Sequence, residues 1–538
     1  VLTSTSSQFS AIAMTTMGFR RLGQPAVARL AMAKNTSRTT ATYTFPQIDP
    51  HNGETFKVYE AMSDETVKKI IGKAHNAFQD WRKIPAPERI ARLHPLAEGL
   101  RRRADEAAEL MFHEMGKPCK QGKAEVMKCA HLVEWYAEHG AQFLKDSEYP
   151  TLPGFKKSFV TYQPLGVILS IMPWNFPMWQ VIRMGVPTLM AGNAVLLKHA
   201  HNCFGSGLLC EELINDLDLP EGLFRSLIVD VPETHQVLEH PLVQGVALTG
   251  SEVAGRAVAA KAGSLLKKAV VELGGSDAYA ILADCDLDQA ATAVVDARVA
   301  NAGQTCIAPK RCIVEKSVKA AFEEKVVEKV KGKLYGSDYG PLVHPVARDQ
   351  VAKQVRDSME QGAKLLYGGE MDRKGVDCKS FFAPTVLTDV TPGMTAFEHE
   401  IFGPVISIVE AQDEAEVIRL ANQTSYGLAG AIFTSDRHKG ERMAVEDIDA
   451  GNVLRERLRT VGSVFAFWRS KELGLRQRMC CLWDVGVCEC QDHLCQVSIR
   501  RKKMVVETTT RWTWTEIRHA QSGHGSCCFQ IGRGRLNH

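Results

Sequence analysis

The stretch GVILSIMPWNFP, residues 166–177, joins an apolar run of strand length directly to a proline-bounded turn. Further apolar runs of strand length lie at residues 194–197, 245–248, 269–273 and 279–282, and helix-length segments separate most of them. Strands that alternate with helix-length crossovers form a mostly parallel sheet. The sequence therefore predicts an α/β fold in which residues 166–177 form a strand and the turn that follows it.

The composition changes along the chain. The first 48 residues contain no Asp or Glu but several Arg and many Ser, Thr and Ala. This pattern is typical of an organelle transit peptide, and equally of a disordered extension, so residues 1–42 are set aside as a leader. Apolar spacing predicts two amphipathic helices over residues 64–103. A second set of strands and helices begins after Ala269, which predicts a domain boundary near residues 274–275.

Charge and cysteine usage exclude several classes of protein. The 538 residues hold 65 Lys and Arg against 62 Asp and Glu, so the formal charge of +3 does not favour a nucleic acid or an anionic membrane as partner. No run of about 18 apolar residues predicts a membrane-spanning helix. Eight of the fifteen cysteines are scattered singly before residue 454, which is typical of reduced thiols. We therefore expect a soluble intracellular protein.

Two motifs follow apolar strands and could contact a ligand. Asn175, in the turn after residues 166–172, offers an amide that can stabilise a developing oxyanion. Residues 249–255, TGSEVAG, open a predicted helix whose N-terminal N–H groups can bind a phosphate. Taken singly, each is equally explained by an ordinary turn residue and by an ordinary capped helix start. TGSEVAG is also not the G-x-G-x-x-G fingerprint.

Two further residues could carry covalent chemistry. Cys306 lies among small residues in NAGQTC, residues 301–306, and a thiolate is a good nucleophile where its surroundings lower its pKa. Glu272 lies at the end of an apolar strand beside two glycines, so its carboxylate could act as a general base. A lone cysteine is also typical of an inert core, and a glutamate at a strand end is often a surface residue.

Four motifs together resemble the aldehyde dehydrogenase superfamily, and the resemblance covers about residues 45–453. The motifs are MPWNFP at 172–177, ELGG at 272–275, GQTC at 303–306 and EIFGP at 400–404. Over residues 166–197 the sequence is most similar to that of the shorter, bacterial-type succinate-semialdehyde dehydrogenases.

The resemblance implies a fold and a division into domains. The fold would be α/β, with a Rossmann-type cofactor domain, an α/β catalytic domain and a bridging β arm. The implied ranges are 43–142 and 163–274 for the cofactor domain, 143–162 for the arm and 275–453 for the catalytic domain.

The resemblance also implies a mechanism. Cys306 would attack the aldehyde carbon, while Asn175 and the backbone N–H of Cys306 would hold the oxyanion. The thiohemiacetal would pass a hydride to NAD or NADP, and Glu272 would activate the water that hydrolyses the resulting thioester. No metal is implied. The other implied cofactor-binding residues are Met172, Pro173, Trp174, Lys198, His201, Gly250, Ser251, Leu273, Glu400 and Phe402, and the substrate-binding residues are Trp179 and Arg183.

Two departures from the family pattern bear on cofactor and substrate. His201 stands where many NAD-preferring members have a glutamate, so NADP use is expected alongside NAD; a surface histidine without a ligand is the alternative. Arg183 matches the arginine that succinate-semialdehyde dehydrogenases use for the substrate carboxylate, with a structural salt bridge as the alternative. A second arginine of the better-known branch is Ala300 here, and a redox-partner cysteine is Ala308.

The chain leaves the family pattern after Val453. Translated one base later, codons compatible with residues 454–457, 466–469, 473–478 and 483–493 can encode FVND, PFGG, SGFGRE and GMWEFVNVKTI, which are the closing motifs of the family. We therefore interpret residues 454–538 as an aberrant, out-of-frame tail, which we expect to be loosely packed. The same shift explains a cluster that resembles zinc ligands in residue type, Cys488, Cys490, His493 and Cys495.

These observations lead to one functional hypothesis and one alternative. The chain is expected to be an NAD(P)-dependent aldehyde dehydrogenase with a small, carboxylate-bearing aldehyde as substrate, favouring succinate semialdehyde. The alternative is an inactive or truncated relative that acts as a binding or scaffold protein. We expect a homo-oligomer for a frame-corrected chain. We expect a mitochondrial or plastid location if residues 1–42 are a transit peptide, and a cytoplasmic one otherwise.

Overall fold

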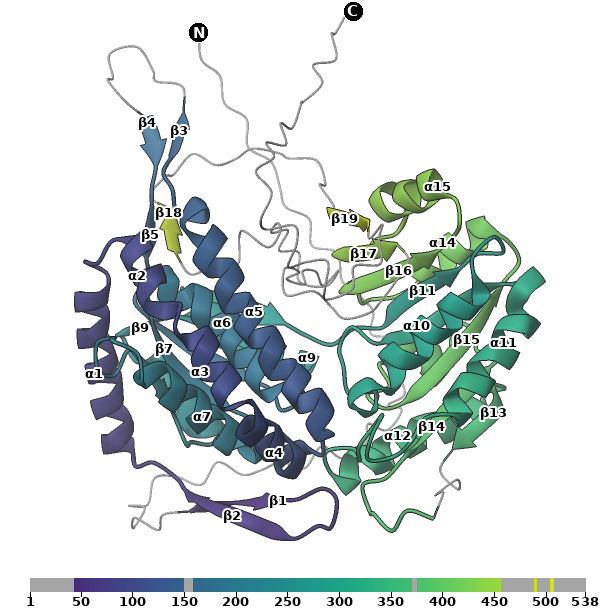
Figure 1. Ribbon diagram of the computed structural model, residues 1–538, viewed down its shortest axis with the longest axis horizontal. Coiled ribbons are helices and arrows are strands. Elements are labelled where there is room, and N and C mark those ends of the chain that lie inside the picture. The colour runs from purple at the N-terminus through teal and green to yellow at the C-terminus, as the bar shows by residue number, and fades with distance from the viewer. Residues whose placement is uncertain (1–42, 150–157, 370–374, 456–487, 491–503, 508–538) are drawn as a thin grey trace, which may run out of the picture. The chain divides into compact units, whose positions relative to one another are not determined.

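The computed structural model describes residues 43–149, 158–369, 375–455, 488–490 and 504–507 (Figure 1). The predicted leader, residues 1–42, lies outside the described residues. Strands and helices alternate along most of the described chain, and both large sheets are dominated by parallel pairs. The predicted α/β fold is therefore confirmed.

A five-stranded sheet contains residues 167–172 as its central strand. Its order is β10 (Lys268–Glu272), β9 (Val243–Thr249), β6 (Val167–Met172), β7 (Ala194–His199) and β8 (Phe224–Ser226), and every pair is parallel. Four of these strands fall where apolar runs predict them. From β6 the chain runs outward to β7 and β8 on one side and later to β9 and β10 on the other. Ligands bind beyond the carboxyl ends of parallel strands at such a reversal of strand order.

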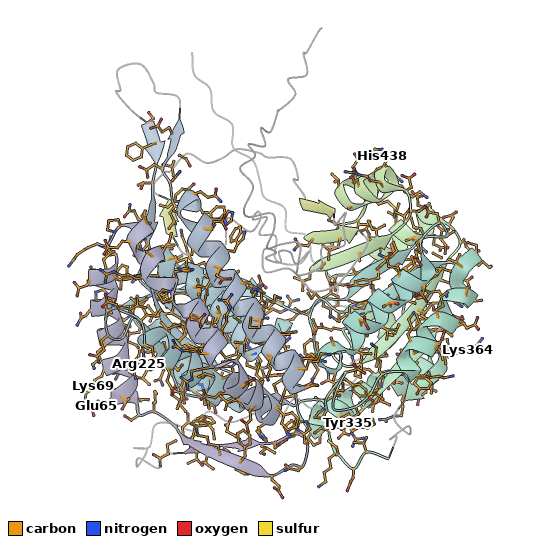
Figure 2. The ribbon with its side chains drawn as sticks, in the orientation of Figure 1. Glu65, Lys69, Arg225, Tyr335, Lys364 and His438 are labelled. Atoms are coloured by element: carbon orange, nitrogen blue, oxygen red, sulfur yellow. The ribbon has the colours of Figure 1, made fainter. Side chains whose placement is uncertain are left out.

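Helices bury this sheet and form its core. Helices α1 (Asp64–Trp81), α6 (Pro177–Met190) and α7 (Phe204–Asn215) pack against its strands, and α5 (Cys119–Phe143) packs on α6 (Figure 1). Every residue of α6 is buried. The outward face of α1 is polar, with an exposed ion pair of 2.7 Å between Glu65 and Lys69 (Figure 2).

The prediction of two helices over residues 64–103 is wrong by one. After α1 the chain forms α2 (Ala86–Leu93) and then a separate α3 (Leu96–Arg102). The break lies at Pro95, which immediately precedes α3. A proline has no backbone N–H to donate and its ring clashes with the preceding turn, so α2 cannot continue through it.

The second large sheet has its own core. Its order is β13 (Lys364–Gly369), β14 (Ala383–Thr388), β15 (Val405–Ala411), β12 (Pro309–Glu315), β11 (Asp277–Ile281), β16 (Ala429–Phe433), β17 (Asn452–Arg455) and β19 (Met504–Glu507). Only the β13–β14 pair is antiparallel. The chain passes from the first sheet to the second between Glu272 and Asp277. This crossing coincides with the ELGG motif.

Short antiparallel pairs lie beside the two large sheets. β1 (Thr44–Ile48) pairs with β2 (Thr55–Glu60), and β3 (Ser147–Tyr149) pairs with β4 (Ser158–Val160) in the segment predicted as the bridging arm. The arm's role in oligomerisation stays a prediction. In the tail, the described β18 (Cys488–Cys490) pairs with β5 (Tyr162–Pro164), and β19 pairs with β17. The rest of the predicted aberrant tail after β17 lies outside the described residues.

The remaining helices complete the layers. They are α4 (Ala104–Met115), η1 (His201–Cys203), α8 (Val231–Glu239), α9 (Glu252–Ser264), α10 (Leu287–Val299), η2 (Ala300–Gly303), α11 (Lys316–Lys331), α12 (Pro345–Glu360), α13 (Thr395–Glu398), α14 (Glu414–Asn422), α15 (Arg437–Arg442) and η3 (Met443–Asp447). No helix in the described ranges is long and apolar enough to cross a membrane.

Candidate active site

The ends of parallel strands bring the predicted site residues to one edge of the five-stranded sheet. Asn175 follows β6, Lys198 lies near the end of β7, Ser251 follows β9, and Glu272 ends β10. Parallel strands all point the same way, so their carboxyl ends share this edge. The topology thus gathers residues that are almost 100 positions apart in the sequence.

Two buried asparagines tie this edge to the loop that carries Cys306. The side-chain amide Nδ2 of Asn175 donates to the backbone oxygen of Gln304 at 3.1 Å. In return, Nδ2 of Asn301 donates to the backbone oxygen of Asn175 at 2.8 Å. The Lys117 ammonium donates to the same Asn175 oxygen at 2.9 Å. The side-chain amide of Asn175, which is predicted to hold an oxyanion, is therefore anchored to the backbone of Gln304, two residues before Cys306.

The loop before Cys306 has a strained backbone. Asn301 and Ala302 both have a φ of 53°, in the left-handed region that non-glycine residues rarely adopt. Gly303 follows with a φ of 71°, and a Cβ added there would lie 2.2 Å from the backbone oxygen of Gly403. Only glycine fits, so the GQTC motif packs directly against the EIFGP motif. Such strain persists where the surrounding structure holds it, and it is concentrated at functional sites.

Cys306 lies in a turn that leads into β12, and no helix begins at it. Burial raises the pKa of its thiol to about 11; the Lys310 charge opposes this rise, and Glu400 and Glu272 add to it. The resting side chain is therefore a thiol at neutral pH. A lowered pKa, which would favour a thiolate, is not present in this state.

This raised pKa makes a testable prediction for the cofactor-free protein. Modification of Cys306 by iodoacetamide should rise about tenfold per pH unit from pH 8 to pH 10, because the thiolate fraction rises tenfold per unit below the pKa. An ordinary thiol with a pKa of about 8.5 would level off in this range. Mass spectrometry of the Cys306 peptide would follow the rate, with the exposed Cys119 as internal control. A rate that levels off below pH 9 would contradict the raised pKa.

Lys310 links the nucleophile loop to a predicted cofactor residue. Its buried ammonium donates to the backbone oxygen of Thr305 at 2.9 Å and to that of Cys306, and it lies 2.9 Å from Oε1 of Glu400. The Thr305 oxygen belongs to the peptide whose N–H is that of Cys306. A cation bound to this oxygen polarises the peptide, so the predicted oxyanion donor is strengthened.

Glu272 and Arg183 form a buried ion pair. The guanidinium Nη2 of Arg183 donates to Oε2 of Glu272 at 2.5 Å, and both side chains are less than a tenth exposed. The other carboxylate oxygen, Oε1, accepts no hydrogen bond from a described residue. The predicted general base and the predicted substrate anchor are thus in direct contact, which neither residue's place in the sequence predicts.

The residues predicted to hold a dinucleotide lie along the same edge. Ser251 caps α9 by accepting a hydrogen bond from the N–H of Ala254 at 3.3 Å. Beside it, a Cβ added at Gly250 would meet no heavy atom closer than 3.7 Å, so the backbone there is open. Burial lowers the pKa of Lys198 to about 8, and its ammonium makes no hydrogen bond or ion pair with a described residue. An open helix N-terminus and a buried unpaired cation fit a nucleotide phosphate and sugar.

A carboxylate near His201 modifies the prediction about NADP. Residue 201 carries no fixed negative charge, as the sequence indicates, but Oδ1 of Asp230 lies 3.2 Å from its Nε2. Asp230 comes from the segment between β8 and α8, where it caps the helix. Burial and the Lys198 charge lower the pKa of His201, and Asp230 opposes them. A negative charge therefore lies near His201, supplied by Asp230, which was not predicted from the sequence.

The predicted nicotinamide end contains close packing between three motifs. Glu400 lies against the ELGG backbone, because a Cβ added at Gly274 would be 2.2 Å from its Oε2. The rings of Trp174 and Phe402 meet edge to face with centroids 5.7 Å apart. Leu273 packs against Gly255 of α9, where an added Cβ would lie 2.4 Å from Cδ2. These contacts bring together the predicted residues, but their roles toward a cofactor stay predictions.

Several residues of this arrangement were not predicted from the sequence. Lys117 and Lys310 bind backbone oxygens next to Asn175 and Cys306, and Asp230 faces His201. Nothing in the sequence marks these lysines, because their function depends on a backbone oxygen far along the chain. Asn301 could have been found, since it lies in the quoted NAGQTC motif. The side chains at residues 488–495, which resemble zinc ligands in residue type and which the frame shift explains, lie outside the described side chains.

Comparison with known proteins gives one consistent result. Residues 37–466 match the aldehyde dehydrogenase family. The chain is 40% identical over 422 residues to the succinate semialdehyde dehydrogenase Sad of Escherichia coli (strain K12), whose name gives NAD(P)+ as cofactor; the match covers 77% of this chain and 90% of that protein. It is 41% identical over 416 residues to a succinate-semialdehyde dehydrogenase of Mycolicibacterium paratuberculosis named for NADP+, covering 76% and 87%. Residues 467–538 lie outside the family match.

Solved structures agree with the sequence relatives. The succinic semialdehyde dehydrogenase of Streptococcus pyogenes, in complex with NADP+, superposes with a TM-score of 0.75 at 34% identity, covering 79% of this chain and 93% of that one. The betaine aldehyde dehydrogenase of Staphylococcus aureus, in complex with NAD+, gives a TM-score of 0.74 at 25% identity, covering 79% and 86%.

Proposed function

Because this chain belongs to the aldehyde dehydrogenase family, we propose that it oxidises succinate semialdehyde to succinate with NAD+ or NADP+. One observation carries the choice of a carboxylate-bearing substrate. The buried guanidinium of Arg183 lies beside the predicted general base Glu272, and the thiol of Cys306 is within electrostatic reach of both. A guanidinium fork suits a carboxylate well, and Arg183 would bind that of the substrate.

The side chains of the site support a covalent route. The S–H bond of Cys306 would break, with its proton passing to the general base Glu272 and on to solvent, as the sulfur forms a bond to the aldehyde carbon. The carbonyl oxygen would become an oxyanion held by the amide of Asn175 and the N–H of Cys306. A bound nicotinamide cofactor supplies the hydride acceptor, which converts the aldehyde carbon to the oxidation level of an acid. Glu272 would then take a proton from water as that water attacks the thioester carbon, and the carbon–sulfur bond would break to release the acid and Cys306.

The residues along the strand edge support a dinucleotide without deciding between its two forms. The helix start at Ser251 and the buried cation Lys198 suit either cofactor. His201 carries no fixed negative charge that would repel a 2′-phosphate, whereas the carboxylate of Asp230 beside it disfavours one. The relatives described above are named for NADP+ or NAD(P)+. We infer that both cofactors are used.

A direct assay tests the proposal. Purified protein, cofactor and succinate semialdehyde should produce NADH or NADPH, measured at 340 nm, with stoichiometric succinate. The same assay with betaine aldehyde, a cation, should give much less product, because Arg183 would repel it. Absence of reduced cofactor with every short aldehyde would favour the alternative, an inactive relative that acts as a binding or scaffold protein.

Removing Arg183 tests the substrate assignment. Arg183→Ala should raise the Michaelis constant for succinate semialdehyde much more than that for butanal, which has the same carbon chain without the carboxylate. The loss of a charged hydrogen-bond partner costs about 1.5–3 kcal/mol, or roughly tenfold to more than a hundredfold. The substitution also leaves Glu272 without its partner, but this affects both substrates. Equal losses on the two aldehydes would mean that Arg183 is structural.

The assembly and the location of the protein are part of the same proposal. A homo-oligomer joined through the arm at β3 and β4 is proposed for a frame-corrected chain, and size-exclusion chromatography with light scattering would test it. A mitochondrial or plastid location is proposed if residues 1–42 act as a transit peptide, and a cytoplasmic one otherwise. A fluorescent fusion to residues 1–42 would decide between them.

A further inference from the structure

Lys128 is a half-buried cation to which the proposed mechanism gives no role. It lies on α5, and its ammonium lies 3.7 Å from the ring centroid of Trp179 on the neighbouring helix α6. A cation over an indole face is attracted by the ring, more strongly where water is excluded. Lys128 makes no ion pair with any residue in the described ranges.

The carboxylate nearest to Lys128 along its own helix is already occupied. Glu125 accepts hydrogen bonds from the backbone N–H groups of Met178 and Trp179 at 3.0 and 2.9 Å, and it pairs with Lys117. It cannot neutralise a second lysine without giving up these bonds. The positive charge of Lys128 is therefore left without a dedicated anion.

Lys128 faces the same space as the predicted substrate residues. Trp179 and Arg183 are four residues apart on α6, so their side chains lie on one face of that helix. The ammonium of Lys128 lies over Trp179 and is within electrostatic reach of Arg183 and of the Cys306 thiol. Glu272 is the anion among these groups, and it is paired with Arg183. Two cations therefore lie near the nucleophile, and Glu272 is paired with one of them, Arg183.

We propose that Lys128 is a second cation of the substrate site, which binds the carboxylate of an acid-bearing aldehyde together with Arg183. This inference rests on the proposed function. It also answers a question raised by the sequence, because the family's second substrate arginine is replaced by Ala300 here. A lysine one helix away supplies the missing charge from a position that the motif does not predict.

The electrostatics of this lysine make the proposal sensitive to pH. Burial lowers the pKa of Lys128 to about 8, and Arg183 adds to the lowering, while Cys129, Glu125 and Cys306 oppose it. Further charged groups around Cys306 are Glu272, which is paired with Arg183, and the Lys310–Glu400 pair. Lys128 is therefore charged below pH 8 and mostly neutral above it. A bound carboxylate would favour the charged form.

The test measures kcat/KM for succinate semialdehyde divided by kcat/KM for butanal. Effects of a substitution on the chemical steps that both aldehydes share cancel in this ratio. Lys128→Met should reduce this ratio roughly tenfold or more, as expected for a lost charged hydrogen bond. Lys128→Arg should keep the ratio within a few fold of wild type. Lys120→Met is the matched control, because Lys120 is an exposed lysine on the same helix, and it should change nothing.

A pH series separates substrate binding from a structural role. In the wild type the ratio should fall several-fold between pH 7 and pH 9, and in Lys128→Arg it should stay flat, because a guanidinium does not titrate there. An unchanged ratio in Lys128→Met, with wild-type preference for the acid-bearing aldehyde intact, would overturn the Lys128 assignment alone. A wild-type enzyme without that preference would overturn both this inference and the proposed function.

Discussion

Cys306→Ala should abolish dehydrogenase turnover, by about 10⁴-fold or more in kcat, as found when a covalent nucleophile is deleted. The reason is that the remaining chemistry passes through the bond between its sulfur and the substrate carbon. No other cysteine lies in a GQTC sequence; of the other described cysteines before residue 454, five lie on helices or on β12, and Cys285 and Cys378 lie in other loops. Reduced cofactor formed with succinate semialdehyde is the measurement.

A matched control separates chemistry from folding. Cys285→Ala removes a partly exposed thiol that precedes α10 and lies outside the site, and it should retain wild-type turnover. Equal melting temperatures of the two variants would show that both are folded. Appreciable turnover by Cys306→Ala would refute the assignment of Cys306 as nucleophile.

Glu272→Gln should lower the steady-state rate by about 10²–10⁴-fold, which is the usual contribution of a general base. The glutamine has nearly the same shape but cannot take a proton from water, so hydrolysis of the thioester should be slowed more than hydride transfer. A rapid burst of reduced cofactor, close to one per active site, should therefore precede slow turnover in stopped-flow measurements.

The ion pair with Arg183 complicates this variant in a way that can be measured. Glu272→Gln removes the carboxylate from a buried guanidinium, and a buried charge without its partner is destabilising. The melting temperature should therefore fall, unlike that of the control Glu98→Gln, which removes an exposed carboxylate. The burst amplitude is counted per folded site, so this loss does not obscure it. If the burst disappears together with steady-state turnover, Glu272 does not act in hydrolysis.

Local sequence determined the secondary structure of the site and the identity of its reactive groups. The run at residues 166–172 is β6 with a shift of one residue, and the strands at 194, 245, 269 and 279 begin within two residues of their predicted starts. The strands at 166, 194, 245 and 279 are mostly buried, which is what an uninterrupted apolar run predicts, whereas the strand at 269 is only partly buried. The reactive groups Asn175, Glu272 and Cys306 could likewise be identified, because each lies in a short motif of contiguous residues. The wrong prediction of two helices over residues 64–103 also had a local cause, because Pro95, which separates α2 from α3, is part of that stretch of sequence.

Tertiary structure alone decided which charges meet. Arg183 and Glu272 are 89 positions apart and come into contact because α6 begins, and β10 ends, at the same edge of one sheet. Asp230 reaches His201 and Lys310 reaches Glu400 in the same way, from elements that no periodicity connects. The pKa of Cys306 is raised by burial, which is a property of the packed site and not of the GQTC motif. Composition and spacing specify which groups a chain contains, but distance and exclusion of water set their electrostatics, and both exist only once the sheets and helices have packed.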